Sequence, residues 1–145
     1  MQGFPKGIKL GEDFLLWIRI ALKYKVAFLN KPLAYYNQDV DAENRGVGRL
    51  HKPENHMLWN LDFLAEEERT NTDYKQLIDN LRTYELMPYY LSKEYRNKAS
   101  EELAKVDWKK QPEKTKKLYK KPIFMLKCRE MFLKYGSLIK RKIVK

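Results

Sequence analysis

The run FLLWIRIALKY at residues 14–24 is the feature that most constrains what this chain folds into. Its apolar side chains follow the 3.6-residue period of an α-helix, and they occupy the other helical faces as well. A helix that is apolar on nearly every face is normally covered on more than one side. The sequence therefore predicts a helix from Asp13 to about Tyr24 with further structure packed around it.

An acidic pair, Glu12 and Asp13, follows Gly11 and precedes this run. Residues 1–12 contain four glycine or proline positions and are predicted to form a loop. Asp13 then stands where an N-cap residue is expected. Taken alone, this position favours a simple helix cap.

Most of the remaining chain is expected to be helical. Residues from Glu54 onward show helical spacing, as do residues 73–90, where Pro88 is expected to kink or end the helix. A third helix is predicted over residues 92–106, with Ser92 as its cap. After a basic linker, Pro122 fits the first turn of a final helix.

Two short segments have the composition of β-strands. These are Val26–Leu29 and Leu33–Tyr36, separated by Asn30-Lys31-Pro32. Two short strands do not make a stable sheet, so they either pair weakly or join a sheet outside this chain. The predicted fold class is a mostly helical α/β fragment.

The net charge of +11 comes entirely from the C-terminal end. Residues 109–145 hold 14 Lys/Arg and 2 Asp/Glu, whereas residues 1–108 have 16 and 17. In the last helix the predicted apolar face opposes a largely basic one, which suits an anionic membrane surface. A helix that packs on the domain is the alternative. Nucleic-acid binding ranks lower, because the body is neutral and carries no recognisable nucleic-acid motif.

Other compositional features narrow the class of protein. The longest uninterrupted apolar stretch in the first helix, Phe14–Ile18, ends at Arg19 and is too short to cross a bilayer. The start of the sequence does not resemble a signal peptide. The single cysteine, Cys128, excludes an internal disulfide and fits a reducing cytoplasm. A cytoplasmic protein, peripheral at the inner face of a membrane, is expected.

The first 40 residues resemble the end of the catalytic domain in family 2 glycosyltransferases with the GT-A fold. The matching residues occur in the family's order, beginning with Phe4 and Gly11-Glu12-Asp13. Leu16-Trp17-Ile18-Arg19, Val26-Ala27-Phe28-Leu29 and Pro32-Leu33-Ala34-Tyr35-Tyr36 follow. No single dipeptide is specific, but the ordered set with its spacing is fairly specific.

This resemblance implies inverting transfer of a sugar from a nucleotide-sugar donor to a hydroxyl of a glycan acceptor, such as a surface polysaccharide or a lipid-linked glycan. Asp13 matches the position of the general base, which takes the proton of the acceptor hydroxyl. Glu12 either orients Asp13 or binds an acceptor hydroxyl. A divalent metal, Mg²⁺ or Mn²⁺, is expected for the intact enzyme only.

The resemblance also bears on a basic loop and on two helix residues. Arg45, Arg49, His51 and Lys52 match a mobile loop that covers the donor pyrophosphate in such enzymes; a solvated basic loop is an equal alternative. Trp17 and Arg19 match the family's helix as possible supports. Packing is favoured for Trp17, whereas a structural ion pair remains one of two options for Arg19.

No metal site is predicted within the chain. Asp39-Val40-Asp41 has the form of the family's metal motif, but it follows the Glu-Asp pair instead of preceding it. His51 and His56 do not have a convincing zinc spacing.

The predicted organisation has three parts. Residues 1–53 form the end of the catalytic domain, 54–108 a helical subdomain, and 109–145 a basic linker with a tail helix. Only twelve residues precede Asp13, so the family's nucleotide-binding half is expected to be absent and the chain alone inactive. A non-catalytic helical interaction module, or a nucleic-acid-binding one that uses the tail, is the alternative function.

Overall fold

The computed structural model describes residues 6–32, 34 and 50–143, with the backbone alone for 134–143. Within these ranges it contains seven α-helices, three short 3-10 helices and one isolated β-bridge, so the mostly helical class is confirmed. The two predicted strands are not shown. Residues 26–29 have no regular secondary structure, and nearly all of 33–36 lies outside the described ranges. The chain divides into two compact units, unit 1 (1–65) and unit 2 (66–145).

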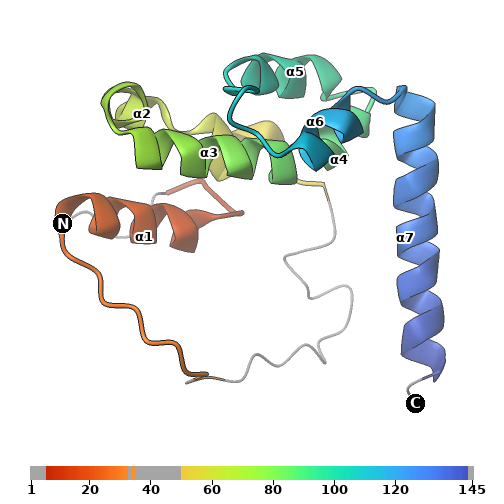
Figure 1. The fold of residues 1–145 in the computed structure, drawn as a ribbon, viewed down its shortest axis with the longest axis horizontal. Helices are drawn as coiled ribbons and strands as arrows, with labels where there is room; N and C mark the ends of the chain where they lie inside the picture. Colours follow the sequence, from red (N-terminus) through yellow and green to blue (C-terminus); the bar gives the residue numbers. More distant parts are fainter. Residues whose placement is uncertain (1–5, 33, 35–49, 144–145) are drawn as a thin grey trace. The chain divides into compact units, whose positions relative to one another are not determined.

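The elements follow one another along the chain as Figure 1 shows them. In order they are α1 (Glu12–Lys23), η1 (Pro53–Asn55), η2 (Met57–Trp59), η3 (Asp62–Leu64), α2 (Ala65–Thr70), α3 (Thr72–Glu85), α4 (Met87–Leu91), α5 (Arg96–Ala104), α6 (Glu113–Tyr119) and α7 (Ile123–Ile143).

Helix α1 begins one residue earlier than predicted, and its cap is a glycine. Gly11 occupies the N-cap with φ 82°, in the left-handed region that glycine adopts without steric cost. Glu12 and Asp13 therefore both lie in the first turn. The prediction that Asp13 is the N-cap is wrong, because Gly11 has already turned the chain into the helix.

The start of α1 is held by the segment that follows the long loop. Leu10 and His56 form a parallel bridge, with Leu10 N donating to Asn55 O at 3.1 Å and Met57 N donating to Leu10 O at 3.0 Å. Gly11 lies against Met57 so closely that a β-carbon on Gly11 would be 2.5 Å from Met57 Sδ. This contact fixes where the first turn of α1 stands in unit 1.

The helix predicted from Glu54 onward is replaced by the three 3-10 helices. His56 has extended backbone, with φ −108° and ψ 138°, and its Nδ1 accepts a hydrogen bond from Leu58 N at 3.2 Å. This residue ends η1 and caps η2, so a continuous helix cannot run through it. Met57 and Leu58 of η2 and Leu64 of η3 are buried in the core of unit 1.

Only one side of α1 is covered in the part of unit 1 that the structure describes. Leu15 and Ile18 are buried, whereas Trp17 is 63% exposed and Phe14 is also exposed. The expectation that α1 is covered on more than one side is therefore wrong for these residues. An apolar face is left in water.

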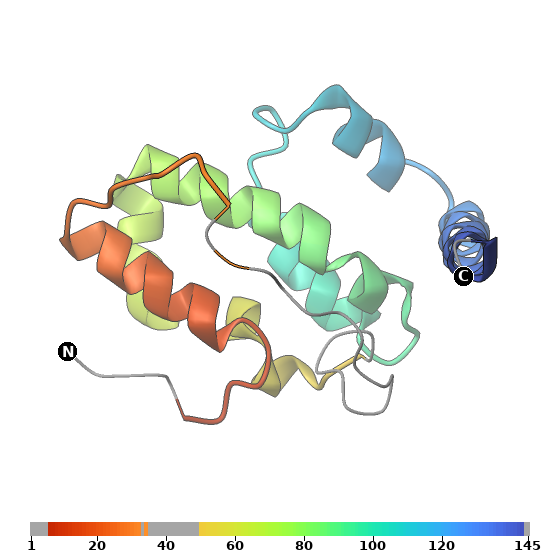
Figure 2. The ribbon, with the colours of Figure 1, turned by 90° about the horizontal axis from the view of Figure 1, so that it is seen from below.

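Unit 2 contains the remaining helices, with boundaries that differ from the prediction at two places (Figure 2). Pro88 lies in the first turn of α4, so it starts a new helix after Glu85. Ser92 ends α4 instead of capping the next helix, and α5 begins only at Arg96. The basic linker contains α6, which was not predicted, while the predicted final helix, α7, begins at Ile123, so Pro122 precedes its first turn instead of lying in it.

The apolar part of the core of unit 2 joins α3, α4 and α5. Ile78 of α3 and Ala99 of α5 are fully buried, as is Leu86 between α3 and α4. Leu126 of α7 packs against Met87 and Leu91 of α4 in a second cluster. This cluster attaches the first turns of α7 to the rest of the unit.

Candidate functional site

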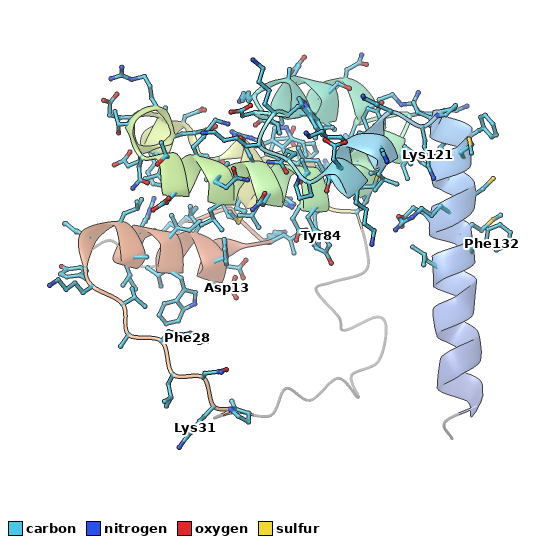
Figure 3. All side chains as sticks on the ribbon, in the orientation of Figure 1. Asp13, Phe28, Lys31, Tyr84, Lys121 and Phe132 are labelled. Atoms are coloured by element: carbon cyan, nitrogen blue, oxygen red, sulfur yellow. The ribbon has the colours of Figure 1, made fainter. Side chains whose placement is uncertain are left out.

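The carboxylate of Asp13 is exposed at the first turn of α1 (Figure 3). Its Oδ1 accepts a hydrogen bond from the backbone N of Phe14 at 2.7 Å, which limits the directions the side chain takes. Glu12 beside it is half-buried. Both carboxylates lie in the first turn of α1, at the positive end of the helix dipole.

Asp13 shares one side of α1 with aromatic residues. Trp17 lies one turn further along the helix, and Phe14 is adjacent. These three exposed residues are called the outer face of α1 below. The exposure of Trp17 differs from the packing role expected for it. A carboxylate beside an aromatic ring suits a hydroxylated ligand, since the carboxylate accepts a hydrogen bond while the ring packs on C–H groups.

Arg19 has a defined partner within unit 1. Its guanidinium carbon lies 4.1 Å from the centre of the Phe63 ring, in a cation–π contact. Because Phe63 belongs to η3, the contact joins α1 to that turn. Arg19 thus has a structural contact of a kind that the sequence did not predict.

The predicted donor loop is only partly described. Arg45 and Arg49 lie outside the described residues, Lys52 is exposed, and His51 is buried. The role proposed for these four side chains therefore stays a prediction.

His56 is a buried side chain that the sequence analysis considered only as a metal ligand. Its ring meets Trp59 edge-on, with centroids 5.5 Å apart, and its Nδ1 caps η2. Burial, with a smaller effect of the nearby His51 charge, lowers the pKa of His56 to about 4. His56 is therefore neutral at pH 7 and serves the local fold.

The described residues do not assemble a metal site. No group of three or more His, Cys, Asp or Glu side chains in the described ranges is arranged to hold a metal ion. Asp39 and Asp41 lie outside those ranges.

A buried ion network in unit 2 was missed by the sequence analysis. Arg82 is almost fully buried and contacts Glu68 through both terminal nitrogens, with Nη2 3.0 Å from Oε2. Its Nε also donates to Glu102 Oε2 at 3.2 Å. Lys75 and Asp79 pair on the same helix, and Asp79 Oδ2 accepts from Asp107 N at 3.0 Å.

These charges are paired in a way that fits a structural role. Burial alone raises the pKa of Glu68, but the hydrogen bond and charge of Arg82, together with Lys75, outweigh it and lower that pKa. For Arg82, burial opposes the charge, yet Glu68 and Glu102 raise its pKa. Ion pairs satisfied in this way hold helices together and do not supply a reactive group.

Part of this network was visible in the sequence. Lys75, Asp79 and Arg82 recur at four- and three-residue intervals on one predicted helix, a spacing that places them side by side. Glu68 and Glu102 come from neighbouring helices, and nothing in their local sequence indicates that they meet Arg82.

The comparisons with known proteins give no relative. No family model matches the sequence, and there is no significant match among curated proteins or solved structures. The glycosyltransferase resemblance therefore rests on the ordered residues of the first 40 positions alone.

Proposed function

We propose that residues 1–53 are the acceptor-side end of an inverting family 2 glycosyltransferase, in which Asp13 is the general base. The observation that carries this proposal is the exposed carboxylate of Asp13 at the first turn of α1. A general base must reach the acceptor hydroxyl, so its carboxylate has to be exposed. Gly11 occupies the N-cap position, and Asp13 lies in the first turn, where its Oδ1 accepts a hydrogen bond from Phe14 N.

The proposed reaction is a single displacement. The Asp13 carboxylate takes the proton of an acceptor hydroxyl while that oxygen forms a bond to the anomeric carbon of the donor sugar. The bond from this carbon to the nucleotide's phosphate oxygen breaks at the same time, and its electron pair leaves with the nucleoside diphosphate. Attack opposite the leaving group inverts the anomeric configuration.

Trp17 supports this proposal from the acceptor side. It lies on the outer face of α1 one helical turn after Asp13, and the residue is 63% exposed. In the proposal its ring packs against the C–H face of an acceptor sugar and holds the hydroxyl near Asp13. The half-buried Glu12 accepts a hydrogen bond from a second hydroxyl or orients Asp13.

Exposed apolar residues support the idea that these residues belong to a larger catalytic domain. Phe28 is 88% exposed, and Val26 and Leu29 beside it are exposed too. A cluster of large apolar side chains in water usually marks a surface that another structure covers. In the proposal, the nucleotide-binding half supplies the sheet that residues 26–29 and 33–36 join.

The proposal is tested with two proteins. One is the 145-residue chain, and the other is a longer enzyme in which a nucleotide-binding region precedes the same 145 residues. Each is assayed for nucleotide release from a set of nucleotide-sugars with glycan acceptors, and the anomeric configuration of product is read by NMR. Transfer with inversion by the longer protein alone is expected. Turnover by the 145-residue chain alone, or retention of configuration, would contradict the proposal.

A further inference from the structure

Helix α7 leaves the body of unit 2 after its first turns. Leu126 is 2% exposed and packs with Met87 and Leu91, while Ile123 is half-buried at the same contact. Beyond this contact no other described element of unit 2 lies alongside α7 (Figure 1). The helix nevertheless continues to Ile143, and its described side chains from Lys127 to Leu133 are exposed, except for the half-buried Glu130.

The side of α7 that faces away from this contact is apolar. Phe124, Met131 and Phe132 are exposed, and the Phe132 side chain points away from the rest of unit 2 (Figure 3). Cys128 and Met125 lie between them and are exposed too. On a helix with 3.6 residues per turn these five positions share one broad side, which is called the α7 stripe below.

Cations flank the α7 stripe. Lys127 and Arg129 are exposed on either side of it, and Lys121 is exposed just before the helix begins. The sequence adds Lys134 and Arg141 at seven-residue intervals after Lys127. Residues 109–145 together carry 14 Lys/Arg against 2 Asp/Glu. A partner that covers the α7 stripe must therefore bind an apolar surface that has a high density of positive charge beside it.

These features favour a lipid surface over a second copy of the chain. Two copies meeting through the stripe bring like charges close together, which costs free energy. The stripe is also broad, whereas a coiled-coil seam is narrow. An anionic bilayer accepts the apolar side chains below its headgroups and pairs the headgroup charge with the flanking lysines and arginines. Within the described residues no helix is long and apolar enough to cross a membrane.

We propose that α7 is an interfacial helix that lies on an anionic lipid bilayer, with the α7 stripe buried among the acyl chains and the flanking cations among the headgroups. This proposal does not depend on the glycosyltransferase assignment. A polyanion such as RNA would pair with the positive charge of the helix. It would not account for the continuous apolar surface that includes Phe124 and Phe132.

The test measures flotation of the full 145-residue chain with vesicles of phosphatidylcholine alone or mixed with phosphatidylglycerol. Binding only to the anionic vesicles, weakening as salt rises, is expected. Phe132→Gln is expected to weaken binding about tenfold, because it removes one large apolar side chain from the acyl region. Lys127→Glu with Arg129→Glu is expected to weaken it by more than tenfold.

Matched controls separate this effect from general charge and exposure. Lys93→Glu with Lys31→Glu changes the net charge equally at exposed sites elsewhere, and Tyr84→Gln removes an exposed aromatic of α3. Both controls are expected to bind vesicles nearly as the unaltered chain does. Circular dichroism is expected to be the same for all variants, since every altered side chain is exposed.

Three results would overturn the proposal. One is no binding to anionic vesicles, and a second is binding that Phe132→Gln leaves unchanged. The third is a stable dimer, or an RNA complex, that depends on the α7 stripe while vesicles are ignored. A dimer would assign the stripe to a second copy of the chain, and an RNA complex would assign the tail to nucleic acid.

Discussion

Gly11 and Met57 are in such close contact that a β-carbon on Gly11 would lie 2.5 Å from Met57 Sδ. Gly11 also has φ 82°, so Gly11→Ala adds backbone strain to a steric clash. The expected loss is about 2–4 kcal/mol of unfolding free energy, from the left-handed penalty and the overpacking together. Urea denaturation followed by tryptophan fluorescence measures it.

Gly7 offers a matched control for this substitution. Its φ is 90°, but a β-carbon there meets nothing within 4 Å in the described structure. Gly7→Ala is therefore expected to cost only the backbone term, about 1–2 kcal/mol. Equal losses for the two variants would show that the contact with Met57 does not position α1.

Arg82 is expected to be the most sensitive charged residue of unit 2. Arg82→Met leaves Glu68 and Glu102 without their main partner in a buried site. Leaving such charges uncompensated costs about 3–5 kcal/mol. The thermal midpoint and the urea midpoint of the variant both report this loss.

Arg69→Met is the control for that change, since Arg69 pairs with Glu66 on the exposed side of α2. A loss below about 1 kcal/mol is expected there. The lowered pKa of Glu68 means that its stabilising effect is complete above the unfolded-state pKa and disappears as the pH falls through the folded-state value. An Arg82→Met variant as stable as Arg69→Met would contradict the structural role of the network.

His56 gives unit 1 a pH dependence of known sign. The unfolded chain binds a proton at His56 below its ordinary pKa of 6.5, whereas the folded chain resists protonation until about pH 4. The unfolded state thus binds more protons in this window, so stability falls as the pH falls from 6.5 toward 4. The expected contribution is about 3 kcal/mol at most.

His56→Asn is expected to flatten this dependence. The Asn side-chain oxygen accepts from Leu58 N in place of Nδ1, so the cap of η2 is retained without a group that titrates. Denaturation midpoints at several pH values between 4 and 7 are compared with those of the unaltered chain. An unchanged slope in the variant would assign the pH dependence to other groups.

Helices α1 and α7 were predictable because local signals agree with their final surroundings. The apolar periodicity of both helices is strong, and Pro122 marks the start of α7. The helix expected from Glu54 failed for a different reason. His56 leaves the helical region to bridge Leu10, and this tertiary contact overrides the local pattern.

The sequence singles out the residues of the candidate site, whose roles stay a prediction, but it does not give their geometry. The order of residues from Gly11 to Tyr36 singles out Asp13, but it does not reveal that Gly11 does the capping or that Trp17 lies in water. Arg82 contacts Glu68 and Glu102 because three helices pack together. The residue spacing within one helix does not predict such contacts between helices.

Asp13→Asn in the enzyme that contains the nucleotide-binding region is the most direct test of the central claim, with Asp73→Asn as control. Both aspartates lie in a helical first turn and are exposed, so neither change is expected to alter stability much. For Asp13→Asn, kcat is expected to fall about 100- to 10,000-fold because the acceptor hydroxyl loses its base, whereas kcat is expected to stay constant for Asp73→Asn. An Asp13→Asn enzyme with unaltered kcat would contradict the central claim.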